Sequence, residues 1–179
     1  LPERGRGIDQ MVRRADMRRG ERGGRGGERG LNRKGGAPSG VFRGRFLSPL
    51  GIPCQSRPWG YVAGVELRTG KTVYRHRNGT IRDMAPVPLP FKVGVPGIGG
   101  PMITAGGVAF LGAAVDDYLR AYNLTNGEVL WEARLPAGGQ STPMTYTVGD
   151  QQFVLMVAGG HGSVGTKPGD YVIAYTLPK

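Results

Sequence analysis

Few side chains in this sequence have the type and spacing that site chemistry requires. His161 stands in the stretch Gly159-Gly160-His161-Gly162, where an imidazole can donate a hydrogen bond and the glycines let backbone N–H groups approach a ligand closely. Taken alone, this pattern favours an ordinary exposed loop histidine. Asp83 is close in sequence to Arg77 and Arg82, which indicates a structural ion pair as readily as a site. The single cysteine, Cys54, excludes an internal disulfide and a zinc site built from clustered cysteines.

Positive charge is concentrated at the start of the chain. The 179 residues carry 24 Lys and Arg against 13 Asp and Glu, a formal net charge of +11, and residues 1–44 hold 12 of these basic residues together with 12 Gly. Such a composition buries too little apolar surface to offset the entropy of ordering, so we expect residues 1–44 to be a disordered Arg/Gly-rich segment. Three interpretations of it stay open: a nucleic-acid-binding arm, a solvated tail without a partner, or an extension that is not natural coding sequence for this domain.

Residues 45–179 form the second predicted domain and are expected to be all-β. Short apolar or alternating runs are separated by Gly and Pro about every ten residues, and no window has the 3.6-residue periodicity of an amphipathic helix. Glycines at 70 and 127 stand where a hairpin turn needs a positive φ. The predicted strands cover residues 60–67, 72–75, 102–104, 108–113, 118–124, 129–132, 144–148, 153–158 and 171–176.

One uncharged stretch could be mistaken for a membrane span. Residues 93–115 contain no charged side chain and are long enough to cross a bilayer, but they include seven Gly and two Pro. We therefore expect two strands with a glycine turn there.

An internal repeat predicts the architecture. Residues 65–74 align with residues 122–131 at an offset of 57, and both read as strand, glycine-containing turn, strand and aromatic residue. Shorter echoes pair residues 100–104 with 142–146 and residues 119–122 with 172–175. Repeats of short strands at this spacing are typical of β-propeller blades. Two or three blades fit in 135 residues, which is fewer than a closed ring needs.

The stretch from Leu119 to Trp131 resembles the tryptophan docking motif of quinoprotein propellers, in which an alanine (Ala121) and a tryptophan (Trp131) pack between adjacent blades. Further motifs follow the same family in order, and the resemblance extends from about Phe46 to Lys179 without including the first 44 residues. These motifs lie at residues 48–55, 58–60, 78–83, 94–96, 134–138 and 158–161. Together they resemble the C-terminal part of the membrane-bound, pyrroloquinoline quinone (PQQ)-dependent glucose/quinate/shikimate dehydrogenases.

This resemblance implies a fold and an activity. It implies the last two to three blades of an eight-bladed quinoprotein propeller on the periplasmic side of a bacterial inner membrane, with PQQ bound near the axis on Ca²⁺. It implies oxidation of glucose, or of a related sugar or polyol, with electrons passed to ubiquinone through a membrane region. The catalytic base, the calcium ligands and the membrane region are expected upstream of the matched part, so we assign no catalytic or metal-binding residue here and expect the isolated chain to be inactive.

The resemblance also implies a set of cofactor-binding positions. His161 and Gly160 match a loop beside the cofactor pocket, and Asp116 matches an acidic residue at the start of the strand that carries Ala121. Ile98 and Gly99 fall where related proteins close over the PQQ ring, although Ile98 replaces the Trp found in some of them. Alternatives for Asp116 and His161 are an ordinary turn aspartate and an ordinary loop histidine.

Two alternatives to glucose oxidation remain from the sequence. The first is a quinate/shikimate dehydrogenase of the same family. The second is a non-catalytic propeller fragment that binds RNA through its Arg/Gly-rich segment, although nucleic acid is not the expected partner because that segment lacks interleaved aromatic residues and is interrupted by Glu21 and Glu28.

Overall fold

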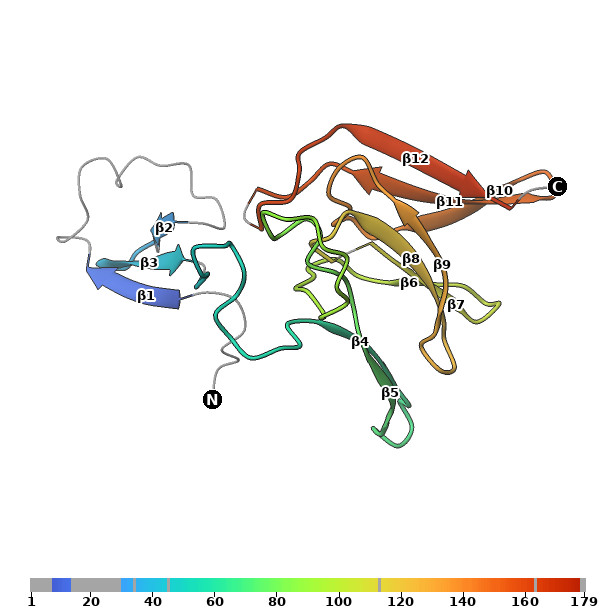
Figure 1. Cartoon of the computed structure of the whole chain (residues 1–179), viewed down its shortest axis with the longest axis horizontal. Helices are drawn as coiled ribbons and strands as arrows, with labels where there is room; N and C mark the ends of the chain where they lie inside the picture. Colours follow the sequence, from blue (N-terminus) through green and yellow to red (C-terminus); the bar gives the residue numbers. More distant parts are fainter. Residues whose placement is uncertain are drawn as a thin grey trace. The chain divides into compact units, whose positions relative to one another are not determined.

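The computed structural model describes residues 8–13, 30–33, 35–44, 46–112, 114–162 and 164–177. The chain divides into two compact units, Leu1–Gln55 and Ser56–Lys179. Every regular element in the described ranges is a β-strand, as Figure 1 shows. The all-β prediction is therefore confirmed.

The first unit contains a three-stranded antiparallel sheet formed by β1 (Ile8–Arg13), β2 (Gly30–Arg33) and β3 (Ser39–Gly44), in the order β1-β3-β2. The predicted disorder is wrong for these three ranges, whereas residues 14–29, the most Arg/Gly-rich part, lie outside the described residues. Most of the few large apolar residues of this segment fall within the strands, and strand pairing supplies the backbone hydrogen bonds. The division between the units follows Gln55, which is later than the boundary we expected after residue 44.

The second unit consists of three antiparallel sheets. They are the hairpin β4-β5, the four-stranded sheet β6-β7-β8-β9 and the three-stranded sheet β10-β11-β12 (Figure 1). The strands are β4 (Tyr61–Val65), β5 (Thr72–Arg77), β6 (Met102–Ile103), β7 (Val108–Leu111), β8 (Tyr118–Asn123), β9 (Val129–Arg134), β10 (Met144–Val148), β11 (Gln151–Ala158) and β12 (Tyr171–Thr176). Each corresponds to a strand predicted from the sequence, with ends that differ by at most three residues.

The internal repeat is visible in the backbone. The hairpins β4-β5 and β8-β9 each turn through a glycine with positive φ, Gly70 at 68° and Gly127 at 73°. Each hairpin also has a register shift at the equivalent place, between Gly64 and Val65 in one and between Ala121 and Tyr122 in the other. Because a β-bulge bends and twists its strand, the two hairpins share a local shape as well as a sequence pattern. They are equivalent elements of the repeat.

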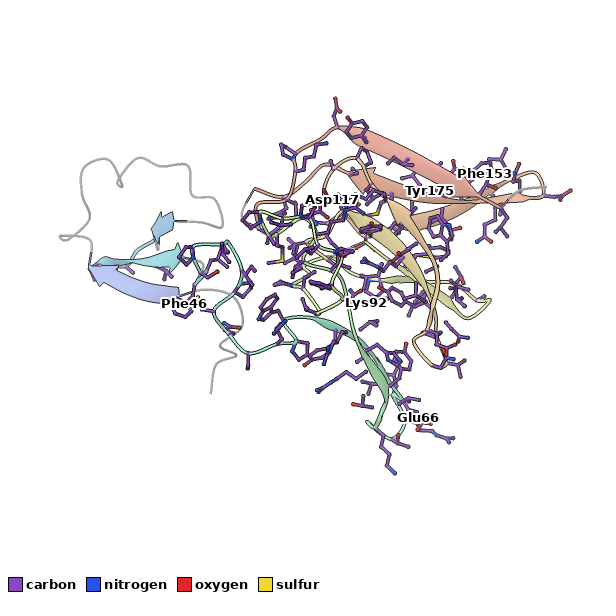
Figure 2. All side chains as sticks on the ribbon, viewed as in Figure 1. Phe46, Glu66, Lys92, Asp117, Phe153 and Tyr175 are labelled. Atoms are coloured by element: carbon purple, nitrogen blue, oxygen red, sulfur yellow. The ribbon has the colours of Figure 1, made fainter. Side chains whose placement is uncertain are left out.

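Two of these sheets pack against each other. Leu119 on β8 and Met156 on β11 are fully buried in one hydrophobic cluster that joins β6-β7-β8-β9 to β10-β11-β12. Trp131 on β9 lies edge-on to Tyr175 on β12, which is labelled in Figure 2, with 5.1 Å between the ring centroids. The predicted packing of Trp131 between blades is therefore confirmed, and Ala121 is its cross-strand partner.

A second cluster is formed by residues from the two ends of the stretch that resembled a membrane span. Val95 and Ala114 are buried there, with Trp59 packed against them. The stretch contains β6 and β7 joined by a turn at Gly107, where φ is 78°, as the sequence predicted. Among the described residues there is no helix with the length and hydropathy of a membrane span.

The close approach of two backbone segments at Gly60 gives a test of this packing. A Cβ at residue 60 would collide with the backbone carbonyl of Val95, so we expect Gly60→Ala to lower the free energy of unfolding by about 2 kcal/mol or more, as overpacking does. Urea unfolding of the full chain measures the change. Gly106→Ala is the matched control, because the nearest atom to its new Cβ is 3.9 Å away. Equal effects of the two substitutions would contradict this packing.

Candidate functional site

The loop that carries His161 is held closed at its base. The Gly160 N–H donates to the Gly138 carbonyl at 2.8 Å, and the Gly138 N–H donates in turn to the Lys167 carbonyl at 3.0 Å. The His161 N–H donates to the Thr166 hydroxyl oxygen at 2.8 Å. Gly160 has a φ of 72°, and a Cβ there would collide with the Lys167 carbonyl, so only glycine fits. His161 is thereby presented from a defined loop.

A chain of hydrogen bonds connects this loop to the strand segment before β6. The Thr166 hydroxyl donates to Gln140 Oε1 at 2.8 Å, and Gln140 Nε2 donates to the Ala114 carbonyl at 3.1 Å. Ala114 forms an antiparallel bridge with Gly97. The structure therefore links the backbone around the predicted residues Ile98 and Gly99 to the loop of Gly160 and His161 through one glutamine.

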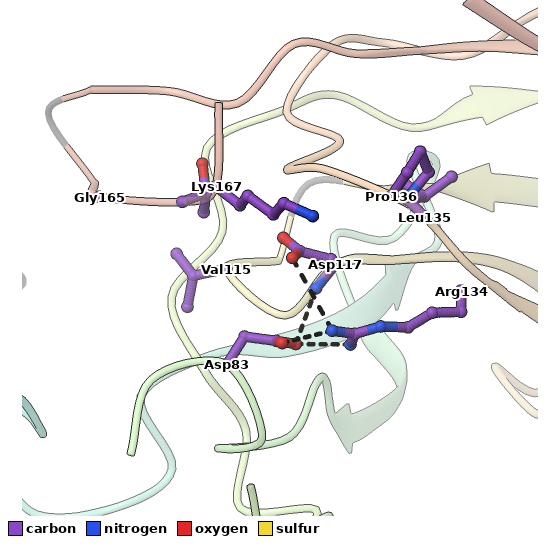
Figure 3. Close-up of a pocket in the computed structure, with 9 residues that line it drawn as sticks. Asp83, Val115, Asp117, Arg134, Leu135, Pro136, Gly165 and Lys167 are labelled. Atoms are coloured by element: carbon purple, nitrogen blue, oxygen red, sulfur yellow. Dashed lines mark hydrogen bonds and ion pairs between the residues drawn. The ribbon is translucent and has the colours of Figure 1, made fainter. Parts of the chain in front are cut away.

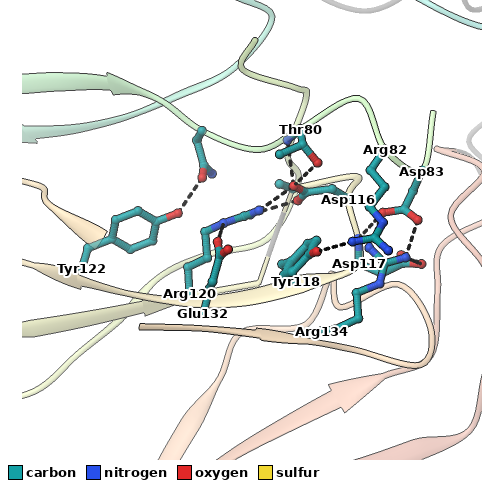
Figure 4. Close-up of polar contacts among 12 residues, drawn as sticks. Thr80, Arg82, Asp83, Asp116, Asp117, Tyr118, Arg120, Tyr122, Glu132 and Arg134 are labelled. Atoms are coloured by element: carbon teal, nitrogen blue, oxygen red, sulfur yellow. Dashed lines mark hydrogen bonds and ion pairs between the residues drawn. The ribbon is translucent and has the colours of Figure 1, made fainter. Parts of the chain in front are cut away.

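Asp116 is buried in an ion pair and does not lie in an exposed turn. Arg120 NH1 and NH2 donate to its two carboxylate oxygens at 2.9 and 2.6 Å, and the Thr80 N–H donates to Oδ2 at 2.7 Å (Figure 4). The exposed fractions of the Asp116 and Arg120 side chains are 0% and 2%. Arg120 Nε also donates to Glu132 at 3.1 Å. Burial favours a lower pKa for Arg120, but its hydrogen bonds and charge attraction to Asp116 outweigh burial and raise that pKa.

A second group of charges surrounds a cavity of about 440 Å³ next to this ion pair. Arg134 forms a bidentate pair with Asp83, and the Asp117 N–H donates to Asp83 Oδ2 at 3.1 Å (Figure 3). Burial raises the pKa of Asp83, but the hydrogen bonds from Arg134 and from the Asp117 backbone bring it below its usual value. Arg82 donates to the Tyr118 hydroxyl at 2.9 Å, so the partner of Asp83 is Arg134 and not the nearby arginines that the sequence suggested.

Asp117 differs from its neighbours because its carboxylate is poorly satisfied. The residue is 5% exposed, and Oδ1 is buried with no hydrogen-bond partner among the described residues. Oδ2 lies 3.9 Å from Arg134 NH2, beyond hydrogen-bond distance. Burial, followed by the negative charge of Asp83, raises the pKa of Asp117 to about 6. Burial and a like-charged neighbour therefore dominate the electrostatics of the Asp117 carboxylate.

The sequence did not assign Asp117, Arg120 or Arg134 to any site. Asp117 adjoins the predicted residue Asp116, and Arg134 begins one of the motifs of the resemblance, which were the signals available. Their partners lie 34 and 51 residues away in the chain, and strand order brings them together. Among the described residues, no group of three or more His, Cys, Asp or Glu side chains is placed to hold a metal ion.

Comparison with known proteins identifies the family of this chain. The family model for the glucose/ethanol/alcohol dehydrogenase β-propeller domain, a PQQ family, matches residues 3–154. The quinoprotein glucose dehydrogenase A of Acinetobacter calcoaceticus is 58% identical over 158 residues, covering 87% of this chain and 20% of that protein. The quinate/shikimate dehydrogenase (quinone) of Acinetobacter baylyi is 44% identical over 150 residues, covering 80% of this chain and 18% of that protein. The crystal structure of quinohemoprotein alcohol dehydrogenase from Comamonas testosteroni superposes with a TM-score of 0.46 at 21% identity. The superposition covers 78% of this chain and 18% of that one.

The chain therefore belongs to the PQQ β-propeller family of glucose, ethanol and alcohol dehydrogenases. It spans about a fifth of the length of these curated relatives. The expectation that residues 1–44 have no counterpart in the family is wrong, because the family match begins at residue 3. Their Arg/Gly-rich composition hid the strands β1 to β3 from sequence reasoning.

The buried ion pair predicts a large and asymmetric mutational effect. Arg120→Met leaves the Asp116 carboxylate buried without its charge partner, so we expect a loss of about 3–5 kcal/mol in the free energy of unfolding. Asp116→Asn combined with Arg120→Met should restore part of that loss. Urea unfolding measures both, with Arg68→Met in the exposed β4-β5 turn as the control. A double variant no more stable than Arg120→Met would argue against an uncompensated charge as the cause.

The raised pKa of Asp117 predicts a specific pH dependence. Between its usual value of 3.8 and about 6, the folded chain binds more protons at this residue than the unfolded chain, so its contribution to stability falls as the pH rises through that window. Asp117→Asn removes this contribution. We expect the variant to gain, relative to wild type, on the order of 1 kcal/mol between pH 4.5 and pH 7 in urea unfolding.

The neighbouring carboxylate, Asp83, changes the stability with pH in the opposite direction, so the effects of the two residues can be distinguished. The pKa of Asp83 is lowered, so its stabilisation is present above pH 3.8 and is lost as the pH falls further. Asp150→Asn, at an exposed turn, is the control substitution. A difference between wild type and Asp117→Asn that does not change with pH would rule out the raised pKa.

Proposed function

We propose that this chain forms the C-terminal blades of a PQQ-dependent dehydrogenase that oxidises glucose or a related sugar or polyol. The observation that carries the proposal is the 58% identity to a quinoprotein glucose dehydrogenase over most of this chain. A quinate/shikimate dehydrogenase matches at 44%, so oxidation of quinate or shikimate is the second candidate. The two relatives match 87% and 80% of this chain, and the higher identity of the first favours glucose as the substrate.

In this proposal the loop of His161 and the segment at Ile98 form one wall of the cofactor pocket. The chemistry of the loop suits an anionic ligand: an imidazole stands among glycines, and a Cβ on Gly162 would meet no atom within 4 Å, which leaves its backbone open to approach. When bound, PQQ supplies the oxidant that takes electrons from the alcohol carbon. His161 would donate a hydrogen bond to a cofactor carboxylate, and Gly160 would shape the loop that presents it.

The remaining members of the wall have supporting roles. Ile98, which is 40% exposed, and Gly99 offer an apolar edge to the cofactor ring. Asp116 holds the start of β8 in place through Arg120 and Thr80, so it acts by positioning the wall. We assign the catalytic base, the Ca²⁺ ligands and the membrane region that reduces ubiquinone to parts of the longer protein outside this chain. The site then faces the periplasm at the bacterial inner membrane.

A chimeric enzyme tests this proposal. The 158-residue matched segment of the Acinetobacter calcoaceticus quinoprotein glucose dehydrogenase is replaced by the corresponding segment of this chain. Because the identity is 58%, we expect a folded chimera that oxidises glucose when PQQ and Ca²⁺ are supplied, with kcat within about tenfold of the host enzyme. Dye-linked oxidation of glucose, quinate and shikimate is measured, with the unmodified host as the reference.

Two results would contradict the proposal in different ways. A chimera that melts like its host and binds PQQ, but oxidises none of the three substrates, would exclude the proposed function. Oxidation of quinate in preference to glucose would replace the first candidate by the second. His161→Leu should weaken PQQ binding in the active chimera by about tenfold or more, as expected for the loss of a charge-assisted hydrogen bond.

A further inference from the structure

The cavity bounded by Asp83, Asp117, Arg134 and Lys167 has no role in the wall described above. We propose that it is a recognition subsite for the hydroxyl groups of a neutral polyol or sugar, in which the Asp117 carboxylate accepts a hydrogen bond from one hydroxyl group. This inference rests on the proposed oxidation of a sugar, and it adds where the hydroxyl groups of the substrate are bound. Figure 3 shows the side chains that line this cavity.

The first argument is the unsatisfied carboxylate. Buried carboxylate oxygens in folded proteins are nearly always hydrogen-bonded, because an unpaired buried charge is costly. Oδ1 of Asp117 is buried with no hydrogen-bond partner among the described residues, and Oδ2 lies 3.9 Å from Arg134 NH2, which is beyond hydrogen-bond distance. The carboxylate lines the cavity, and a rotation about its terminal torsion exchanges its two oxygens, so one incoming donor can satisfy it. The Asp117 carboxylate can therefore accept a hydrogen bond from a ligand, because the described residues supply no donor to Oδ1.

The second argument is charge balance, which decides the kind of donor. Arg134 and Lys167 line the same cavity as the two carboxylates, and both lower the pKa of Asp117 by their positive charge. Two carboxylates balanced by two cationic side chains give the cavity little net charge. A divalent cation would be repelled by Arg134 and Lys167, and an anion would be repelled by Asp83 and Asp117. A neutral ligand that carries its own donors fits best.

The third argument is the arrangement of donors and acceptors that remain. Asp83 is occupied by Arg134 and by the Asp117 N–H, so the open acceptor is Asp117. The Lys167 side chain is exposed and extends toward Asp117 in Figure 3, where its ammonium group is a donor. A hydroxyl group is both donor and acceptor, so it can donate to the carboxylate and accept from the ammonium group.

The walls suit the carbon face of the same ligand. Val115, Leu135 and Pro136 also line the cavity and supply apolar surface beside the charged groups. The volume of about 440 Å³ lies within the range of roughly 300–1,000 Å³ that small-molecule sites occupy. A polyol can therefore place C–H groups against these apolar side chains and hydroxyl groups against Asp117 and Lys167. This makes Asp117 a binding residue that takes no part in the oxidation itself.

The experiment uses the PQQ-loaded chimera and two substitutions. Asp117→Leu removes the acceptor, and Lys167→Met removes an exposed donor without disturbing the fold. We expect each to raise KM for glucose about tenfold while kcat changes less than threefold. The effect should be absent for the deoxyglucose analogue that lacks the contacted hydroxyl, so a panel of 2-, 3-, 4- and 6-deoxyglucose identifies that group. Asp150→Leu is the matched control at an exposed turn.

The outcomes separate this inference from the proposed function. An unsubstituted chimera that folds but oxidises no sugar would defeat the proposed function, and saturation-transfer NMR with glucose then tests the subsite directly by comparing that chimera with Lys167→Met. Equal NMR signals from the two proteins would overturn the subsite. So would an active chimera in which both substitutions leave KM and the deoxyglucose pattern unchanged. A change in Ca²⁺ requirement or in PQQ affinity alone would overturn it too, because the cavity would then serve the cofactor or the metal.

Discussion

The buried ion pair between Asp116 and Arg120 is the constraint on which the site region depends. Taking both charges out of water is costly, and the cost is offset only because the guanidinium meets both carboxylate oxygens while Thr80 supplies further donors. Glu132 binds the remaining Nε of Arg120 from the neighbouring strand. The pair therefore ties β8, β9 and the segment before β6 together. Since Asp116 cannot move, Asp117 is held in its buried position, and so is the bridge at Ala114.

Three aspartates in this small region have different surroundings because their partners differ. Asp116 is matched by a buried guanidinium, and Asp83 is matched by Arg134, which keeps its pKa low. Asp117 follows Asp116 directly, so its backbone is fixed while its carboxylate is left with burial and two negative neighbours. A hydrogen-bonded ion pair next to a carboxylate without a donor is the arrangement expected where a fold supports a binding site. The ion pair keeps the backbone rigid, and the unpaired carboxylate oxygen can accept a hydrogen bond from a ligand.

The arc of blades explains why so much apolar surface is exposed. Val65 and Leu67 on the first hairpin, Leu130 on β9 and Val172 on β12 are all exposed, although such side chains pack between blades in a propeller. The Acinetobacter calcoaceticus relative is about five times as long as the segment that it shares with this chain. Within the arc, the contact between Trp131 and Tyr175 shows how one blade covers the next.

The sequence by itself determined the strands of the second unit, the hairpin glycines and the blade repeat, because these depend on local periodicity and turn chemistry that neighbouring residues encode. Its motifs indicated the family by resemblance. It also placed His161, Gly160, Ile98, Gly99 and Asp116 in segments that the structure links through Gln140 and Ala114. It failed in residues 1–44, where glycine and arginine conceal strands whose pairing is long-range. Only the tertiary structure decided that Asp116 is neutralised by Arg120, that Asp83 pairs with Arg134, and that Asp117 is left unsatisfied. The free energy of a buried charge depends on its burial and on partners that are dozens of residues away in the chain. Neither can be derived from the residues next to it in the sequence.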